Sequence, residues 1–211
     1  EKGPWLMYIC GWGIPRADGR LPNTTGVAFS EDEGQSFYYR HEAPILKMDK
    51  PWDKEGTGSV FVRCEGKQFQ MYYTSIGHYF DKPEGVETGH GDVIPRIGVG
   101  FAVSDDGVDW EKPQDDLMVS PRGFETQPYE YISSKPFLLK EDDGYRMWLH
   151  TFGTAYRVRS LLGQDGMNWE WEESGIDGEF GVGEKGCFDD RQRCYVSVIK
   201  FGDEYHCWYT G

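Results

Sequence analysis

The chain alternates short apolar runs with polar turns, and none of the runs has the 3.6-residue spacing of an amphipathic helix. One kind of run, with large apolar or aromatic residues at its centre, recurs four times, at residues 6–9, 70–73, 146–149 and 206–209. The second residues of successive runs lie 64, 76 and 60 residues apart. Self-similarity at a period of this size indicates a repeat architecture.

Two further motifs accompany these runs. After the first three comes a strand of small and apolar residues that ends in an acidic turn and an aromatic residue, at residues 26–37, 98–110 and 158–169. Before the last three stands an apolar segment that ends in a tight turn containing Gly, at residues 59–67, 136–144 and 196–203. Glycine accepts the positive φ that hairpin turns need. The repeating unit is therefore predicted to be four short antiparallel strands.

Units that expose an apolar face unless a neighbour covers it form solenoids or propellers. Four strands per unit without a helical period favour the all-β propeller. Strand counting predicts one partial propeller domain over residues 1–211, with incomplete blades at 1–40 and 195–211 and whole blades at 59–113 and 136–172. Residues 59–73, 97–110 and 136–169 should be strand and turn throughout. Such a chain has unpaired sheet edges at both ends, which makes self-association through those edges possible.

Composition narrows the function. The net charge of -14 would repel a phosphate backbone, so nucleic acid is not expected as a partner. No apolar run is long enough to cross a membrane. The five cysteines are odd in number and lack CxxC spacing, which favours buried thiols in a reducing compartment and slightly favours the cytoplasm, although localisation stays open. Metal ligands do not cluster in the sequence, so neither a metal nor a cofactor is expected.

Propeller topology sorts the loops onto two sides. The turns at Asp32, Asp106 and Asp165 should lie on one side, where each carboxylate accepts backbone N–H bonds and serves structure only. The opposite side receives the long loops at residues 10–25, 41–58, 74–96, 111–134 and 170–193. Long loops on a rigid scaffold are the usual place of binding residues. Binding residues are therefore expected on this second side.

These loops carry carboxylates, histidines and tryptophans, a combination that suits a carbohydrate because acids handle glycosidic oxygens and indole faces stack on sugar C–H surfaces. The candidates are Trp12, Trp52, Asp53, Glu55, His78, His90, Glu130, His150, Asp189, Asp190, Arg191 and Arg193. Several have a second interpretation. Glu130 can be an ordinary loop acid, residues 189–193 can be a self-compensating surface turn, and His150 can be a packed core residue. His78 and His90 are better interpreted as solvated loop residues.

The repeated strand, the Asp-Gly turn and the Ser-Asp-Asp-Gly-x-x-Trp turn resemble the five-bladed propeller glycosidases that cleave arabinans, xylans and fructans. The chain is more similar still to uncharacterised glycosidase-like proteins of bacterial surface-polysaccharide gene clusters, and Cys194-Tyr195 fits that group. The resemblance implies three catalytic carboxylates at the starts of the inner strands of the first three blades. The third of these carboxylates belongs to a Glu-Gly pair in the family, and Glu55 keeps this pair two residues upstream of the expected register. Glu130 and Asp189 stand at comparable entrances of later blades, which resemble substrate-contact positions.

The resulting hypothesis is an inverting glycoside hydrolase, or a fragment of one, in which Glu55 or Glu130 donates a proton and an aspartate outside this chain activates water. Inversion requires the two carboxyl groups to lie roughly 6.5–9.5 Å apart. The predicted substrate-binding residues are Trp12, Trp52, His150, Asp189, Asp190, Arg191 and Arg193. One alternative is a non-catalytic carbohydrate-binding propeller. Another is a glycoside phosphorylase or transferase in which Arg191 and Arg193 hold an anion.

Overall fold

The computed structural model describes residues 3–18, 20, 22–40, 43–126, 129–172 and 181–211, and its regular structure is entirely β over these residues. The twelve strands are β1 (Trp5–Trp12), β2 (Asn23–Ser30), β3 (Tyr38–Tyr39), β4 (Gly56–Glu65), β5 (Gln68–Asp81), β6 (Val93–Ser104), β7 (Ile132–Glu141), β8 (Gly144–Phe152), β9 (Tyr156–Gly163), β10 (Glu170–Trp171), β11 (Cys194–Phe201) and β12 (Glu204–Thr210). The predicted strand and turn segments are confirmed.

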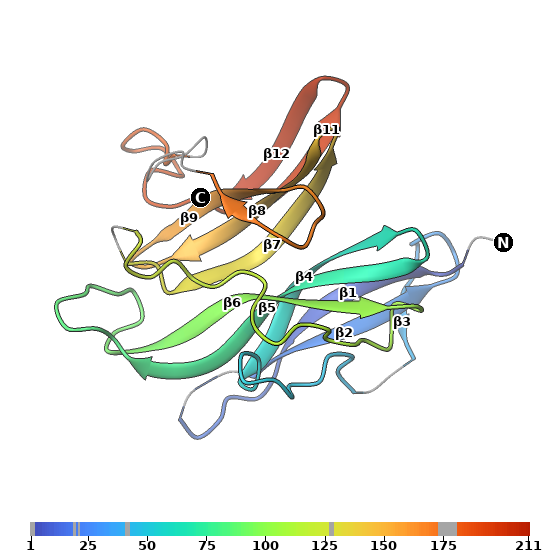
Figure 1. Cartoon of the computed structure of the whole chain (residues 1–211), viewed down its shortest axis with the longest axis horizontal. Coiled ribbons are helices and arrows are strands. Elements are labelled where there is room, and N and C mark those ends of the chain that lie inside the picture. Colours follow the sequence, from blue (N-terminus) through green and yellow to red (C-terminus); the bar gives the residue numbers. More distant parts are fainter. Residues whose placement is uncertain (1–2, 19, 21, 41–42, 127–128, 173–180) are drawn as a thin grey trace.

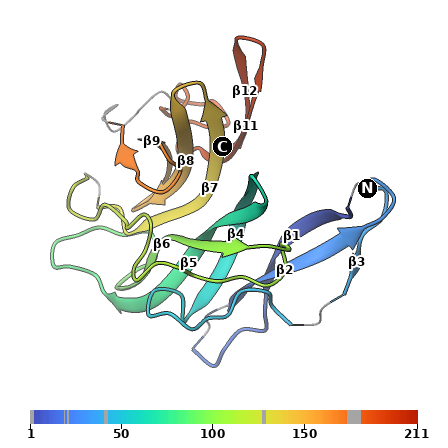
Figure 2. The ribbon, with the colours of Figure 1, turned by 45° about the vertical axis from the view of Figure 1, so that its right-hand side comes forward.

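The strands form four consecutive antiparallel groups, β1–β3, β4–β6, β7–β10 and β11–β12. The first three groups join into one ten-stranded sheet through two single parallel pairs, Asn23 with Gly56 and Ile97 with Ile132. The last group is a separate two-stranded sheet. Figures 1 and 2 show the groups following one another, with β1–β3 and β11–β12 at opposite ends. The last strand of each of the first three groups is short. It is β3 in the first group and β10 in the third, with two residues each, and in the second group a single bridge between Val103 and Glu111 takes its place.

The apolar core lies between neighbouring groups. Tyr8 and Trp110 pack edge to face between the first group and the second. Tyr72 joins Leu149 in the cluster between the second group and the third. Trp148 packs with the buried strand residues of β11 at the next boundary. Burying a large apolar side chain contributes about 1.5–3 kcal/mol, so each group depends on its neighbour for much of its stability.

An unusual backbone feature is shared by β4, β7 and β11, the first strands of the second, third and fourth groups, which we call the inner strands. Each has a register shift near its start, and each shift contains a non-glycine residue with positive φ: Ser59 (44°), Lys135 (51°) and Tyr195 (59°). Such residues are rare outside bulges and turns. The bulge lets a backbone N–H reach across to the preceding group: Lys135 donates to the hydroxyl of Thr74 at 2.8 Å.

The structure corrects two sequence expectations. The predicted loop at 74–96 is largely strand, because β5 continues to Asp81 and β6 begins at Val93, and β4 and β7 also begin before the predicted strands. Gly- and Ser-rich segments look like loops in the sequence, but backbone ladder bonds do not depend on apolar side chains. The prediction of buried thiols is also wrong for Cys64 and Cys187, which are exposed, whereas Cys194 is buried; all five cysteines are free.

Candidate functional site

Strand pairing places the long loops on one side of the sheet. β1, β5 and β8 end beside the starts of β2, β6 and β9, as in the pairs Trp12 with Asn23 and Phe152 with Tyr156. The two parallel pairs bring the starts of β4 and β7 to the same side. We call this the mouth side. The turns that follow β2, β6 and β9 lie at the opposite ends of the strands. The strand ends therefore agree with the predicted sorting, while residues 19, 21, 41–42, 127–128 and 173–180 of the predicted loops lie outside the described residues.

The turn aspartates of the opposite side bond to their own turns. Asp106 accepts backbone N–H bonds from Val108 at 2.8 Å and Asp109 at 2.9 Å. Asp165 accepts the same two bonds within its own turn, and they lower the pKa of Asp165 to about 2. Hydrogen bonds from Ser36 and Ser30 likewise lower the pKa of Asp32 to about 2. These contacts agree with the structural interpretation of the three carboxylates.

A cavity of about 670 Å³ opens on the mouth side, and we call it the mouth cavity. It spans the first three strand groups. The residues that line it are Trp12, Asp18, Arg20, Asn23, Ile76, Tyr79, His90, Val93, Pro95, Ile97, Ile132 and Tyr156. Aromatic walls with a few polar groups are typical of small-molecule sites of this volume.

Trp12 is the most exposed aromatic residue of the mouth cavity, with 70% of its surface accessible. Opposite charges lie in the same lining: the guanidinium of Arg20 is 3.5 Å from Asp18 and stacks over the ring of Tyr79, with its central carbon 3.8 Å from the ring centre. A guanidinium over an aromatic face gains about 0.5–1 kcal/mol at an exposed site. This stacking fixes the loop between β1 and β2 against β5.

Glu55 stands beside the mouth cavity rather than in its lining. Its backbone N–H donates to the carbonyl of Ile76, and its carboxylate accepts a bond from Arg16 at 2.5 Å. In this arrangement Glu55 is an acceptor, whereas a general acid must donate a proton. Arg16 and Arg20 belong to the same loop, so the loop that carries the cavity wall also holds the candidate acid.

Trp52 lies in the core below Glu55, where its indole N–H donates to the hydroxyl of Tyr73 at 3.4 Å. The same hydroxyl donates to Asp53 at 2.9 Å, and Lys112 pairs with Asp53 at 2.5 Å. Asp53 is fully buried, and a buried charge requires a partner of this kind. The cluster anchors the turn that leads into β4 and therefore the position of Glu55.

Glu130 is also buried rather than open to the mouth. Only 2% of its surface is accessible, and Oε1 accepts bonds from the guanidinium of Arg159 at 2.7 and 3.2 Å. Its second oxygen, Oε2, has no hydrogen-bond partner among the described residues. Glu130 therefore faces a neighbouring strand, β9, through a buried ion pair.

His150 is buried, which is the second of the two interpretations given from the sequence, that of a packed core residue. Its Nε2 accepts the backbone N–H of Val196 at 2.9 Å, so the imidazole joins β8 to β11. Burial, with the nearby charge of Lys135, lowers the pKa of His150 to about 3. The ring is therefore neutral at pH 7, which leaves Nε2 free to accept this bond.

The segment before β11 forms its own compensating contacts. Arg193 pairs with Asp189 at 2.6 Å, and Tyr209 of β12 donates to the same carboxylate at 2.8 Å. Asp190 accepts the backbone N–H of Gly186. Arg191 is exposed, and its carbonyl accepts a bond from Arg157. None of the four predicted residues at 189–193 lines the mouth cavity.

The mouth cavity thus contains one of the predicted site residues, Trp12. It also contains His90, which is an exposed loop residue, as the sequence favoured. His78 is exposed on β5, with its ring beside Phe80. Sequence reasoning missed Arg20 and Tyr79, although both fall within the long loops of the mouth side as they were predicted. Arg20 leaves an irregular loop, from which the direction of a side chain cannot be predicted, and Tyr79 lies on β5, in the part of the predicted loop that is strand.

Among the described residues, no three His, Cys, Asp or Glu side chains gather in a way that could hold a metal ion. The described part of the chain also contains no helix long and apolar enough to span a membrane.

No protein-family model matches the chain. An uncharacterized protein of Mycobacterium tuberculosis, Rv1502, is 29% identical over 174 residues, which cover 82% of this chain and 52% of that protein. A β-1,2-mannobiose phosphorylase of Thermoanaerobacter is 27% identical over 146 residues, covering 64% of this chain and 44% of the enzyme. The chain spans about half the length of the curated relatives that it matches.

Among solved structures, a glycoside hydrolase superposes with a TM-score of 0.74 at 18% identity, over 99% of this chain and 59% of the hydrolase. The chain shares the fold of the glycosidase-like β-propellers. A GH32 β-fructofuranosidase of Bombyx mori, BmSUC1, superposes with a TM-score of 0.62 at 14% identity, over 97% of this chain and 38% of the enzyme. A variant of that enzyme has been solved in complex with sucrose. At these identities the likeness shows the glycosidase-like propeller fold alone.

Proposed function

We propose that this propeller binds a carbohydrate in the mouth cavity. The observation that carries the proposal is the exposed indole of Trp12 at a cavity of about 670 Å³ that also contains Tyr79 and Tyr156. Aromatic faces stack on sugar C–H surfaces, while Asp18 and Arg20 offer an acceptor and donors for hydroxyl groups. The sucrose complex of the structurally similar fructofuranosidase supports the same ligand class.

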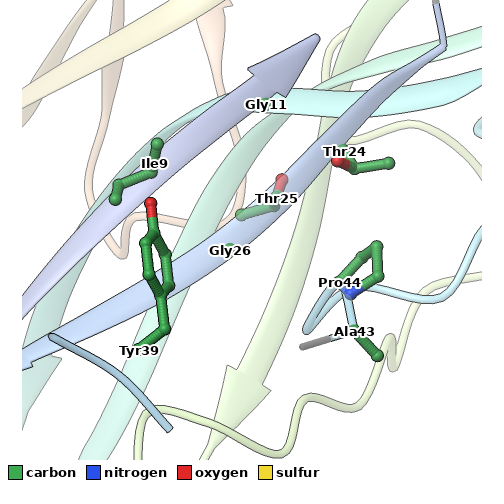
Figure 3. Close-up of a pocket in the computed structure, with 8 residues that line it drawn as sticks. All are labelled: Ile9, Gly11, Thr24, Thr25, Gly26, Tyr39, Ala43 and Pro44. Carbon is green, nitrogen blue, oxygen red and sulfur yellow. The ribbon is translucent and has the colours of Figure 1, made fainter. Parts of the chain in front are cut away.

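The proposal includes the architecture. We assign the strand groups to a five-bladed propeller in which two blades are whole, at 59–113 and 136–172, and two are incomplete, at 1–40 and 195–211. Apolar side chains uncovered at the two ends support this assignment, among them Met7 and Trp208. At the first end the sheet face forms a cavity of about 430 Å³ lined by Ile9, Tyr39 and neighbouring residues (Figure 3). Association of copies through these ends would appear as a concentration-dependent mass in sedimentation experiments.

Inverting hydrolysis is the second candidate function, and the observation that favours it is the position of Glu55 beside the mouth cavity, before the inner strand β4. Here Glu55 would act as the acid once Arg16 releases its carboxylate. Glu130 is the weaker candidate, because its buried carboxylate is held by Arg159. Arg193 is already occupied by Asp189, which offers little support for an anion site of a phosphorylase. Because the base is assigned to an aspartate outside this chain, the assay uses the chain together with the segment that carries this aspartate. Reducing-sugar release by that protein but not by its Glu55→Gln variant would support hydrolysis, and release that requires added phosphate would support phosphorolysis.

The binding proposal is tested with two tryptophans of the same strand. Trp12 and Trp5 stand at opposite ends of β1 and are 70% and 54% exposed. We expect Trp12→Ala to weaken binding of sucrose or β-1,2-mannobiose roughly tenfold, because an aromatic contact contributes about 0.5–1.5 kcal/mol beyond its buried area. Trp5→Ala is the matched control and should bind as wild type does. Calorimetric titration measures both; equal affinity of the Trp12 variant and wild type would contradict the assignment of the cavity.

A further inference from the structure

His90 is fixed at the wall of the mouth cavity from a loop that crosses between two strand groups. The loop joins β5 to β6, and the N–H of Gly89 donates to the carbonyl of Gly153 at 2.8 Å, which docks it on the connection between β8 and β9. The imidazole lies against Phe152, with ring centres 4.9 Å apart, and meets Tyr131 edge to face at 5.7 Å. These contacts orient the ring, although His90 as a residue is exposed.

The contact between His90 and Tyr131 bears on which ring nitrogen of His90 carries the proton. His90 Nδ1 lies 2.6 Å from the hydroxyl oxygen of Tyr131, which is almost completely buried. Burial raises the pKa of Tyr131 to about 12 and lowers the pKa of His90, so both groups are neutral at pH 7. A buried hydroxyl hydrogen requires an acceptor, and we assign that role to Nδ1, which lies within hydrogen-bond distance. A neutral imidazole that accepts at Nδ1 carries its hydrogen on Nε2.

We propose that His90 is a sugar-binding residue of the mouth cavity that donates Nε2–H to an oxygen of a neutral carbohydrate, with Tyr131 as its positioning residue. The proposal rests on the carbohydrate function and extends it to a ligand class. Because Nδ1 is bonded to the buried wall, the opposite edge of the ring, with Nε2, is the one available to the cavity.

The charges around His90 favour a neutral ligand over an anion. Among the described residues of the lining, only Asp18 and Arg20 are charged at pH 7, and they compensate each other at 3.5 Å. Burial raises the pKa of Tyr79 and Tyr156, so both phenols are uncharged at pH 7. The described lining therefore carries no net charge, and an anion would have to separate Arg20 from Asp18 to gain a cation.

Nitrogen NMR of the full chain tests the positioning step without any ligand. In wild type at pH 7 we expect the His90 signals of the neutral form with hydrogen on Nε2. Tyr131→Phe removes the donor to Nδ1 and should produce a mixture of both tautomers. Loss of a residue that only packs against the ring would not change the tautomer. A wild-type His90 protonated on Nδ1 would overturn the assignment.

Calorimetric titration with sucrose and β-1,2-mannobiose tests the binding step. We expect His90→Ala to weaken binding roughly tenfold, since a neutral hydrogen bond contributes about 0.5–1.5 kcal/mol, and His90→Gln, which keeps an N–H donor, to recover part of the loss. Binding that depends on Trp12 but is unchanged in His90→Ala would overturn the His90 proposal and leave the carbohydrate function standing. Failure of wild type to bind either sugar at 50 mM, on the order of the weakest useful affinity, would count against both. Tighter binding of inorganic phosphate than of either sugar would overturn the neutral ligand class.

Discussion

The buried pair of Glu130 and Arg159 offers the sharpest test of the packing between β9 and the segment that precedes β7. Arg159→Leu removes the cation that holds Oε1 at 2.7 Å, and it leaves a carboxylate with 2% exposure beside an apolar side chain. Removing one partner of a buried ion pair costs about 3–5 kcal/mol. For a chain of this size each kcal/mol lowers Tm by roughly 2–4 °C, so the expected loss is roughly 6–20 °C.

Urea unfolding followed by tryptophan fluorescence measures this cost, with Arg157→Leu as the control on the same strand. Arg157 bonds two carbonyl oxygens and has no ion pair among the described residues, so its loss should cost only about 1 kcal/mol. Because two apolar residues can replace a buried pair at little cost, Glu130→Leu combined with Arg159→Leu should recover most of the stability. An Arg159→Leu cost below about 1 kcal/mol would refute the argument, since the carboxylate would then have another way to be satisfied.

Two further substitutions test the turns and the sheet. Asp165 has a folded pKa of about 2, below its ordinary value of 3.8, so its contribution to stability is present above pH 4 and is lost as pH falls toward 2. Asp165→Asn should therefore make the midpoint of urea unfolding depend less on pH between 4 and 2, and an unchanged pH dependence would contradict the turn assignment. Gly100→Ala places a methyl group against the ring of its cross-strand partner Tyr73 and should cost about 1–3 kcal/mol. Gly26→Ala, which meets no atom within 4 Å, should be neutral or slightly stabilising, and equal costs for the two glycine variants would show that the ring moves aside.

Much of the fold could be predicted from the sequence because hairpin turns and apolar strands are local signals. The turns at Gly66, Gly144 and Gly202 have the positive φ that their sequences predicted. The early starts of β4 and β7 were not predictable in this way, since Thr57 and Ser133 pair through the backbone and carry no apolar signal.

The site was less predictable because function depends on where a side chain points. Glu130 was found by its place before an inner strand, yet its environment depends on Arg159, which lies 29 residues further along the chain. His90 appeared as one polar residue in a polar loop; what distinguishes it is the contact with Tyr131, 41 residues away. Such pairings are tertiary, and no local pattern in one sequence reveals them.

The bulges of the inner strands have a consequence for how this repeat could be rearranged. Thr74 and His150 occupy the same place in successive units, each opposite the residue that precedes the bulge, yet one accepts the next unit's N–H through a hydroxyl and the other through an imidazole. Each boundary thus contains a joint, that is, a hydrogen bond whose acceptor side chain belongs to one unit and whose donor N–H belongs to the next. Exchange of whole units would separate the acceptor from its donor. A graft whose ends lie within the inner strands, between the bulge and the following turn, would keep each acceptor with its donor. Recombination within the unit should therefore preserve the fold better than recombination at its ends.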